Sequence, residues 1–300
     1  MKLPGPGAEY QFKMPMVSVL MTAYNREPYI AEAIKSVLAS SFADFELIIV
    51  DDGSRDRTVE IAREFLSDAR VQLHLNETNL GDYPNRNRAA GLARGKYLKY
   101  LDSDDLIYPH GLAVMVAAME QFPEAALGMC RPASPAGPYP ACMTPRAAYA
   151  EHFLGNGLFD FGPTGAIIRT RCFREAGGFS GKRYVGDFEM WIKLAARWQV
   201  VKLPEGLTWW RTHAGQEYQA GAHSYGYHMA YAIAMDALAA PACPLSAEEQ
   251  GRAVAIKRRR HGRDLLRLAV RERQLRAAWR IMQATQFKPM DLLCAFRSAP

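Results

Sequence analysis

Three carboxylates follow a short apolar and aromatic run at Tyr97–Leu101. They belong to Asp102, Asp104 and Asp105. The run is typical of a buried strand, and like charges this close repel one another unless a cation compensates them. Hard cations such as Mg²⁺ and Mn²⁺ bind carboxylate and phosphate oxygens. The cluster is therefore either a cation site at a strand end or an acidic turn that caps the helix expected near Pro109.

A second acidic group follows another predicted strand. Phe45–Val50 is largely apolar and runs into Asp51-Asp52-Gly53-Ser54. A carboxylate at such a turn can accept a hydrogen bond from the N–H of a nucleotide base or from a ribose hydroxyl. Thr22 ends the first predicted strand. Because ligands of parallel sheets bind at the carboxyl ends of the strands, we expect these side chains to converge with those of Asp102–Asp105.

The elements that must hold these residues alternate between strand and helix. This alternation predicts a parallel sheet with right-handed crossovers. Gly95 is expected to end the third helix as its C′ residue. Strands are expected at 16–22, 45–50, 71–75, 97–101, 126–130 and 162–169, and helices after Pro28, over 59–66, up to Ala93 and over 110–121.

The composition indicates a globular protein with a sizeable core. The 300 residues, 49% of them hydrophobic, allow one large α/β domain, or a domain of about 250 residues with an appendage. No apolar stretch is long enough to span a membrane, and residues 1–15 lack the apolar segment of a secretory signal. The five scattered cysteines suit a reducing compartment. We expect a cytoplasmic protein, either free or peripheral on the inner face of the membrane.

Several segments together resemble family 2 of the inverting glycosyltransferases, over roughly residues 16–215. Their order and spacing match as well as their residues. The resemblance implies a GT-A fold of the α/β class, a single Rossmann-like, mostly parallel sheet flanked by helices. The matching segments are Val17–Asn25, Ile49–Ser54, Asn79–Gly81, Arg86-Asn87 and Leu101–Asp105.

The resemblance also implies which residues hold the donor. Asp102-Ser103-Asp104 is similar to the DxD motif that holds Mn²⁺ or Mg²⁺ on the diphosphate, and whether Asp104 or Asp105 is the direct ligand stays open. His213, in a segment similar to the family's late Arg-x-His, is a third candidate metal ligand. Arg86 would approach the ribose or the pyrophosphate. The nucleotide-binding set is Thr22, Ala23, Tyr24, Asn25, Asp51, Asp52, Arg86 and Asp102.

Asp187 lies where the family has its general base, after a similar segment at Phe173–Phe179. Many members have Glu-Asp here, whereas this chain has Gly186-Asp187. One carboxylate is enough for an inverting transfer, because a single base takes the acceptor proton. The alternative is that Asp187 is an N-cap of the following helix. Glu189 and Trp191 are placed on the acceptor side, although Glu189 could instead face water.

The positive charge belongs to the end of the chain. From Arg252 to Lys288 there are twelve Lys and Arg and two acids, Asp264 and Glu272. This segment therefore has a charge of +10, and the whole chain has one of +6. The rest of the chain therefore carries about −4. A helix is expected to start at Ser246–Glu249, and Gly262 is expected to split the segment into two helices.

We divide the chain into four parts: a tail (1–15), a donor half (16–130), an acceptor and catalytic half (131–222), and a basic helical extension (223–300). The five prolines of 131–145 predict a loop, either functional or a rigid surface connection. Three roles are open for the extension: packing on the catalytic domain, binding an anionic membrane surface, or forming an oligomer contact. Nucleic acid is not expected, since no aromatic platform accompanies the charge.

These observations predict a metal-dependent inverting glycosyltransferase. It would move a sugar from a nucleotide diphosphate donor, with UDP favoured, to a hydroxyl of a glycan or lipid-linked acceptor in polysaccharide or cell-surface glycan synthesis. The alternatives are a non-catalytic nucleotide-sugar binder or scaffold, and a nucleotidyltransferase, which would need a Gly-rich basic loop where Thr22–Asn25 stands. No G-x-G-x-x-G follows the first strand, which excludes a dinucleotide oxidoreductase.

Overall fold

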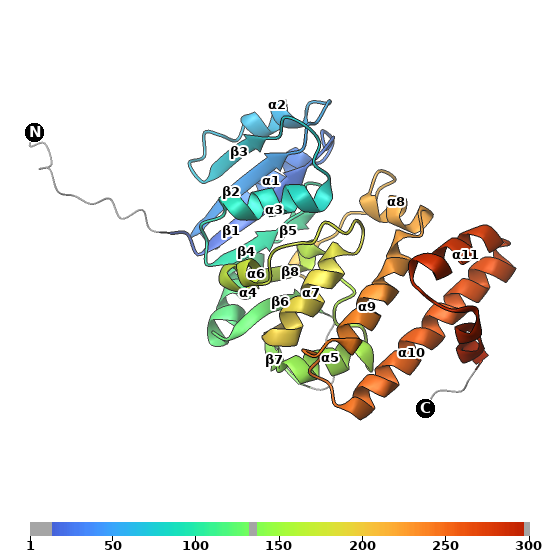
Figure 1. Cartoon of the computed structure of the whole chain (residues 1–300). Helices are drawn as coiled ribbons and strands as arrows, with labels where there is room; N and C mark the ends of the chain where they lie inside the picture. Colours follow the sequence, from blue (N-terminus) through green and yellow to red (C-terminus); the bar gives the residue numbers. More distant parts are fainter. Residues whose placement is uncertain (1–13, 132–136, 297–300) are drawn as a thin grey trace, which may run out of the picture.

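The computed structural model describes residues 14–131 and 137–296. Most of the predicted tail, and Pro132 and Pro135 of the predicted loop, lie outside the described residues. The centre is an eight-stranded sheet in the order β3-β2-β1-β4-β8-β6-β9-β7 (Figure 1). The strands are β1 (Val17–Ala23), β2 (Phe45–Asp51), β3 (Val71–Leu75), β4 (Tyr97–Tyr100), β6 (Ala125–Cys130), β7 (Ala141–Met143), β8 (Ala166–Arg169) and β9 (Gln199–Leu203).

Six of these strands point the same way, and β8 and β7 run antiparallel to their neighbours. A separate two-stranded ribbon pairs β5 (Leu106–Ile107) with β10 (Thr208–Trp209). This ribbon brings the segment after the acidic turn next to the segment that leads to His213. The predicted mostly parallel sheet is therefore confirmed.

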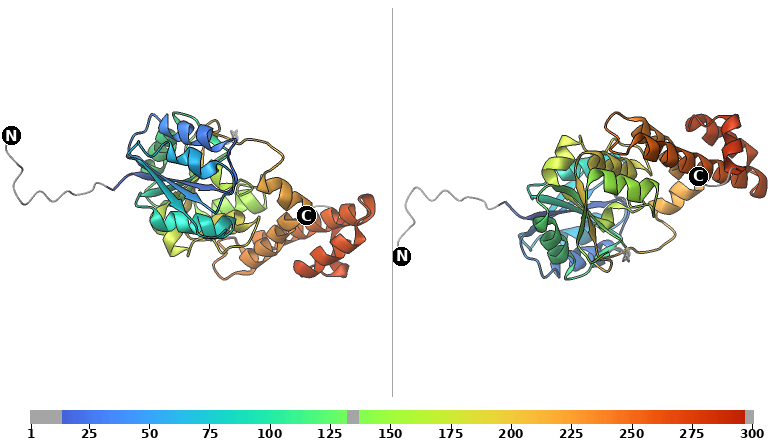
Figure 2. Two further views of the ribbon diagram at one scale, coloured as in Figure 1. Left: turned by 90° about the horizontal axis from the view of Figure 1, so that it is seen from above. Right: turned by 90° about the horizontal axis from the view of Figure 1, so that it is seen from below.

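Helices cover both faces of the sheet (Figure 2). They are α1 (Ile30–Leu38), α2 (Thr58–Arg63), α3 (Asp82–Leu92), α4 (Gly111–Gln121), α5 (Pro145–Phe153), η1 (Pro163–Gly165), α6 (Thr170–Glu175) and α7 (Gly186–Arg197). Alternate strand residues point to opposite faces. Val19 packs with Ile34 of α1 and Met115 of α4, whereas Leu20 packs in the cluster that contains Ala89 of α3. A sheet covered on both sides needs strands that are apolar on both faces, as β2 is.

Several expectations about local structure are wrong, and one is the loop predicted for 131–145, which contains the strand β7. Gly95 is not a left-handed C′ residue, because Ala93 already leaves the helix in an extended conformation with ψ of 135°. Gly95 is required for close packing, since a Cβ there would lie 2.4 Å from the backbone nitrogen of Ser18. The segment 162–169 is a strand only in its second half, β8, because η1 turns the chain first.

The C-terminal extension is helical, as expected. Helix α8 (Glu217–His223) ends where the extension begins, and the elements of the extension are η2 (Gly226–His228), α9 (Met229–Ala239), α10 (Ala247–Leu266), η3 (Arg267–Arg271), α11 (Leu275–Ala284) and η4 (Pro289–Phe296). A capping box starts α10, with Ser246 and Glu249 each accepting the other's backbone N–H. The expectation that Gly262 splits the segment is wrong: Gly262 is buried inside an unbroken α10, and the chain turns only after the π-helical turn η3. One glycine costs a helix only about 1 kcal/mol, which the packing of α10 offsets.

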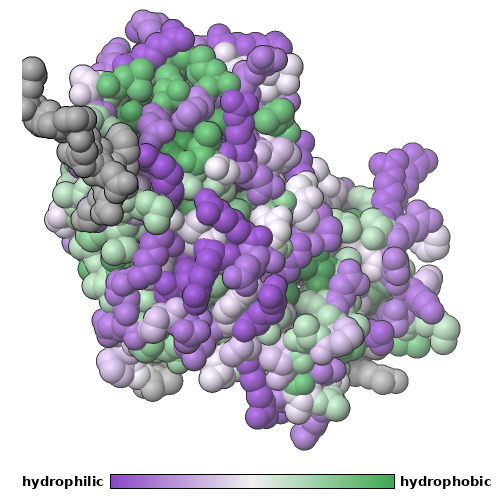
Figure 3. Space-filling model, turned by 60° about the vertical axis from the view of Figure 1, so that its left-hand side comes forward, coloured by the Kyte–Doolittle hydropathy of each residue, from purple (hydrophilic) through white to green (hydrophobic). Residues whose placement is uncertain are grey.

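One part of the extension packs on the sheet domain, and the other part packs only within the extension. Ile233 of α9 and Ala253 of α10 join the core cluster of α3 and α7. Beyond them, Leu265, Ile281 and Phe287 form a separate small cluster. In the part of the chain described, no helix combines the length and the apolar character needed to cross a membrane. Figure 3 shows one face of the molecule, where apolar side chains gather near the top and hydrophilic ones cover most of the lower half.

Candidate active site

The carboxyl ends of β1, β2 and β4 bring the predicted residues to one edge of the sheet. The Ser103 hydroxyl donates a 2.8 Å hydrogen bond to the carbonyl of Thr22, and the Asp52 N–H donates one of 2.8 Å to the carbonyl of Ala23. The acidic turn 102–105 therefore lies on one side of the end of β1, and the Asp51-Asp52 turn on the other. This arrangement follows from the parallel pairing of β1 with both β2 and β4.

Asp51 and Asp52 shape the loops at this edge. Both are buried, and Asp51 accepts two backbone N–H groups of its own turn. Asp52 accepts hydrogen bonds of 2.5–2.9 Å from the Asn76 amide and from the N–H groups of Leu80 and Gly81. Asp52 thereby fixes the segment that leads into α3. A carboxylate offers about four acceptor positions, and Oδ2 of Asp52 uses one of them in these bonds.

The chain turns sharply after β1. Tyr24 is exposed, and Asn25 adopts a left-handed conformation with φ of 53°, which asparagine tolerates better than most residues. The Asn25 side chain accepts the N–H of Arg55 at 2.8 Å, which joins the two loops. The turn directs Arg26 back to the acidic cluster, where its Nε donates to Asp104 Oδ2 at 3.0 Å. Arg26 is a site residue that the sequence analysis missed.

Asp105 points inward. It is fully buried and accepts hydrogen bonds from the Thr164 hydroxyl at 2.6 Å and from the Arg211 N–H at 3.0 Å. Burial, and then the nearby Asp102 carboxylate, raise the pKa of Asp105 to about 7. Beneath it, the buried Lys99 ammonium donates to the carbonyls of Tyr100 and Thr164. Asp105 therefore ties the 102–105 turn to η1 and to the segment before His213.

Asp104 lies nearer the rim of the same turn. Its Oδ2 lies 3.0 Å from His213 Nε2 as well as 3.0 Å from Arg26. The Gly215 N–H donates to His213 Nδ1 at 3.2 Å, so Nε2 is the ring atom that faces Asp104. Among the described residues, no group of three His, Cys, Asp or Glu side chains is gathered as a metal cage. One carboxylate and one imidazole, with substrate phosphate oxygens added, nevertheless fit the ligand set of a nucleotide-bound Mn²⁺ or Mg²⁺.

Asp102 faces α3. Its Oδ1 lies 2.8 Å from Arg86 Nη2, and Arg86 Nε donates to Asp82 at 2.7 Å. Arg86 is buried, and its backbone carbonyl accepts the Tyr100 hydroxyl. The predicted pair Arg86 and Asp102 is therefore brought together, and the guanidinium compensates two carboxylates at once.

Asp187 of α7 contacts Tyr83, which precedes Arg86 by one turn of α3. It is the second residue of α7, whose N-cap is Val185, so Asp187 is not the N-cap. The Tyr83 hydroxyl lies 3.2 Å from Asp187 Oδ1 and accepts the Asp187 N–H at 3.1 Å. Burial raises the pKa of Asp187 to about 6, while the Phe188 N–H lowers it. Such a pKa suits a general base near neutral pH.

The glycine before Asp187 makes room for Tyr83. A Cβ placed on Gly186 would lie 2.8 Å from the Tyr83 ring. On the other side, a Cβ on Gly162 would lie 4.0 Å from Asp187 Oδ2, so a residue without a side chain flanks that oxygen. Both hydrogen bonds of the Asp187 carboxylate within the described residues go to Oδ1. Oδ2 therefore has no hydrogen bond within the described residues.

Of the two residues expected on the acceptor side, Trp191 is excluded by its burial, whereas the role of Glu189 stays a prediction. Trp191 is 0% exposed, and its indole N–H donates to the Phe161 carbonyl at 2.9 Å, so Trp191 packs in the core and cannot touch an acceptor. Glu189 pairs with Lys182 at 2.9 Å and accepts the Ser180 hydroxyl, instead of facing water alone. Helical spacing identified α7 but not the face on which each residue lies.

The amino-acid sequence is similar to those of known glycosyltransferases. The family profile described as "Glycosyl transferase family 2" matches residues 18–177. An uncharacterised glycosyltransferase of Haemophilus influenzae is 42% identical over 95 residues, which are 31% of this chain and 38% of that protein. WfgD of Escherichia coli, a "UDP-Glc:alpha-D-GlcNAc-diphosphoundecaprenol beta-1,3-glucosyltransferase", is 38% identical over 104 residues, 35% of this chain and 41% of WfgD. The matched part is less than half the length of either relative.

Solved structures agree on the fold. TarS of S. aureus (1–349) in complex with UDP-GlcNAc superposes with a TM-score of 0.68 at 20% identity, over 90% of this chain and 81% of that one. The mannosyltransferase PcManGT of Pyrobaculum calidifontis, in complex with GDP-Man and Mn²⁺, gives a TM-score of 0.55 at 18% identity, over 95% and 88% of the chains. The GT-A fold is therefore confirmed. Since the family profile covers more than half of the chain, this protein belongs to glycosyl transferase family 2.

Proposed function

We propose that this protein is a metal-dependent inverting glycosyltransferase. It moves a hexosyl group from a nucleotide diphosphate donor to a hydroxyl of a glycan or lipid-linked acceptor, in polysaccharide or cell-surface glycan synthesis. A UDP-sugar is the favoured donor, because TarS was solved with UDP-GlcNAc and WfgD is named as UDP-glucose-dependent. The name of WfgD also gives it a diphosphoundecaprenol-linked acceptor, which supports a lipid-linked acceptor here.

The observation that carries the proposal is that α3 contacts both halves of the site. Arg86 pairs with Asp102 of the DxD-type turn, and Tyr83 contacts Asp187. These two residues of α3 stand three positions apart, so they project from one face of the helix. Group transfer requires donor and base at a fixed separation, and small displacements are costly. A packed helix that holds both meets this requirement.

In the proposed reaction, Asp187 Oδ2 accepts the proton of the acceptor hydroxyl. The hydroxyl oxygen attacks the anomeric carbon from the face opposite the diphosphate. The bond from that carbon to the diphosphate oxygen breaks, and its electron pair leaves with the diphosphate, so the configuration inverts. Tyr83 holds Oδ1 throughout. With a pKa of about 6, Asp187 is mostly deprotonated at neutral pH and ready to act as the base.

Asp104 and His213 would hold Mn²⁺ or Mg²⁺, which when bound stabilises the negative charge of the leaving diphosphate. Asp105 positions this pair through Arg211 and the turn backbone. The nucleoside is proposed to lie along Thr22–Asn25, with Asp52 Oδ2 accepting an N–H of the base. Arg86 and Asp102 face the ribose and the diphosphate.

The test is a thermal-unfolding series with UDP-, GDP- and dTDP-sugars, each with and without Mn²⁺. A ligand at 100 times its Kd stabilises the native state by about 2.7 kcal/mol, so the true donor gives the largest rise in Tm. We expect a UDP-sugar with Mn²⁺ to give that rise. A chain that responds to no nucleotide sugar contradicts the proposal. A chain that binds but transfers nothing to any glycan or lipid-linked acceptor is instead a nucleotide-sugar binder.

A further inference from the structure

The end of the chain exposes large apolar side chains. Val270, Leu275, Trp279, Met290 and Leu293 are between 54% and 79% exposed, and we call these five residues the C-terminal apolar surface. Elsewhere in the described residues, only Met14 among the large apolar side chains exceeds 54% exposure. Exposed apolar residues that gather in one region, unlike scattered ones, mark an interaction site.

Two short helices, α11 and η4, carry four of these side chains. Leu275 and Trp279 stand one turn apart on α11, on its outer face, while Ile281 packs inward. Met290 and Leu293 are three residues apart in η4, and in a 3-10 helix such residues lie directly in line. Trp279 and Pro289 line the same open hollow, of about 320 Å³. The outer face of α11 is therefore continuous with the start of η4.

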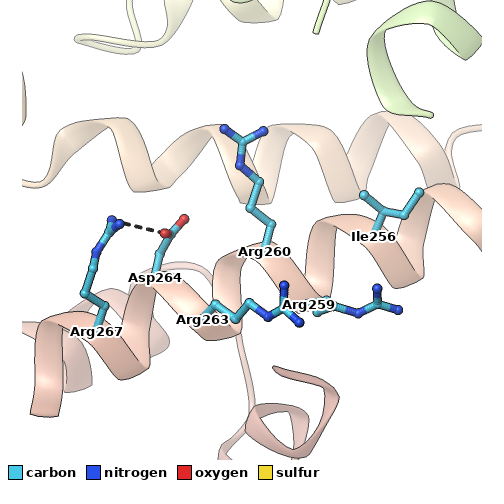
Figure 4. Close-up of a pocket in the computed structure, with 6 residues that line it drawn as sticks. All are labelled: Ile256, Arg259, Arg260, Arg263, Asp264 and Arg267. Atoms are coloured by element: carbon cyan, nitrogen blue, oxygen red, sulfur yellow. Dashed lines mark hydrogen bonds and ion pairs between the residues drawn. The ribbon is translucent and has the colours of Figure 1, made fainter. Parts of the chain in front are cut away.

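Positive charge accompanies this surface on α11 and on the neighbouring helix α10. Arg276 and Arg280 form a second exposed row on α11, next to Leu275 and Trp279. A groove of about 490 Å³ along α10 is lined by four arginines and Ile256, with Asp264 the single acid (Figure 4). The segment Arg252–Lys288 carries +10 in all. An occupant must therefore offer both negative charge and an apolar layer.

We propose that the C-terminal apolar surface binds the face of an anionic phospholipid membrane. The apolar side chains would enter the boundary between headgroups and acyl chains, and the arginines would contact lipid phosphates. A second copy of this chain fits less well, because it would bring +10 against +10. Amphipathic segments rich in Arg, with Trp and Leu on the apolar face, bind membranes in this way.

The surface adjoins the acceptor half of the site. The Tyr225 hydroxyl donates to Gln274, the residue before α11. Two residues further on, Tyr227 packs against Tyr184, with ring centroids 5.9 Å apart, on the loop that leads to Asp187. Figure 1 shows α8 and α11 at the same end of the molecule. A membrane there would present a lipid-linked acceptor close to the base; that consequence rests on the proposed function, whereas membrane binding itself does not.

The experiment is sedimentation of the full chain with phosphatidylcholine vesicles, with and without phosphatidylglycerol. We expect binding to the anionic vesicles at low salt and at least tenfold weaker binding to the neutral ones. Leu275→Ser with Trp279→Ser, and separately Arg276→Gln with Arg280→Gln, should each weaken binding to anionic vesicles about tenfold or more. Leu66→Ser and Arg63→Gln, exposed residues near the end of α2, are the matched controls and should bind as the wild type does.

Two results would overturn the proposal. One is that the paired variants sediment with anionic vesicles as well as the wild type and the controls do. The other is that light scattering shows a wild-type dimer that Leu275→Ser with Trp279→Ser dissociates, while no vesicle binds the wild type, since a second copy then covers the surface. Because the substituted residues are exposed, no variant should lower the wild-type Tm, and all should keep its shift with a UDP-sugar. Failure of membrane binding is thus separable from failure of the donor site.

Discussion

The acidic edge of the sheet and the basic C-terminal helices both concentrate charge, but they balance it differently. At the edge, carboxylates meet partners from distant elements: Asp102 meets Arg86, and Asp104 meets Arg26 and His213. In the segment Arg252–Lys288, twelve cations face two acids, and most of the arginines are exposed. The edge neutralises its charge internally, whereas the helices leave most of their cations exposed to solvent.

This difference has a consequence for stability. A buried charge is costly unless it is paired, so removing one member of a buried pair destabilises the fold. Exposed charges remain solvated, and like charges one turn apart on a helix repel each other. Removing a charge should therefore destabilise the edge and stabilise the helices. Asp187 and Asp105 are exceptions at the edge, because burial raises the pKa of each carboxyl and so disfavours its charged form.

The largest effect is expected for Asp187→Asn. Loss of the base should lower kcat on the order of 10³-fold, with UDP-sugar binding retained. The same change should raise the free energy of unfolding at pH 7.5 by about 2 kcal/mol. The folded pKa of about 6 exceeds that of the unfolded chain, so the wild type loses stability as pH rises from about 4 to 6.

Transfer kinetics and thermal unfolding at pH 7.5 and pH 3.5 check this prediction. The stabilisation should vanish at pH 3.5, where Asp187 is protonated in both states. The control is Glu175→Gln, an exposed residue at the end of α6, which should change neither kcat nor the free energy of unfolding. Wild-type turnover in Asp187→Asn would remove Asp187 from the mechanism.

Replacing Asp104 or its neighbour Asp105 by alanine should have different effects on stability and on the response to Mn²⁺. Asp105→Ala leaves the Thr164 hydroxyl and the Arg211 N–H without their acceptor and should destabilise the fold by about 2–3 kcal/mol. Asp104→Ala should cost less, about 1–2 kcal/mol, because the Arg26 and His213 side chains are 22% and 12% exposed and keep some contact with water, but it should abolish the Mn²⁺-dependent shift in Tm. Urea unfolding and Mn²⁺ titration separate the two. A Mn²⁺ response that survives in Asp104→Ala would contradict the assignment.

Tyr83→Phe should have an intermediate effect. The hydroxyl stabilises the charged form of Asp187, so its loss raises the pKa of Asp187 and moves the acid limb of the kcat profile above its wild-type value near pH 6. We expect about a tenfold lower kcat at pH 6.5, with an unchanged KM for the donor. The control is Tyr149→Phe, which removes a hydroxyl that donates to the carbonyl of Ile192 on α7, the helix of Asp187. This change should not move the acid limb. An unshifted profile in Tyr83→Phe would show that the tyrosine only packs against Gly186.

The smallest effect belongs to the C-terminal helices. Arg276→Glu replaces a repulsive pair with Arg280, one turn away, by an attractive one, and should stabilise the chain by about 0.5 kcal/mol at low salt. Raising the salt should shrink the gain, since screening weakens both pairs. Chemical denaturation at two ionic strengths measures it. Destabilisation by this variant would show that Arg276 has a partner that balances its charge.

Local sequence patterns predicted the sheet edge well. Apolar runs such as Phe45–Val50 that end in acids encode both a buried strand and its polar terminus, so the convergence of Thr22, Asp52 and the 102–105 turn could be predicted. Patterns failed where a residue's role depends on what packs against it. Gly262 suggested a helix break, and Trp191 suggested a surface contact, yet both are buried.

The sequence by itself determined the alternation of strands and helices and the location of the acids at strand ends, and its family resemblance indicated Asp187 as the candidate base. Only the tertiary structure decided that Asp105 faces inward and Asp104 faces His213, and that Tyr83 fills the space that Gly186 leaves open. The reason is that strand and helix periodicity is local, whereas these partners stand 59, 109 and 104 residues apart along the chain. No local pattern specifies such contacts, because they form only when separate elements pack together.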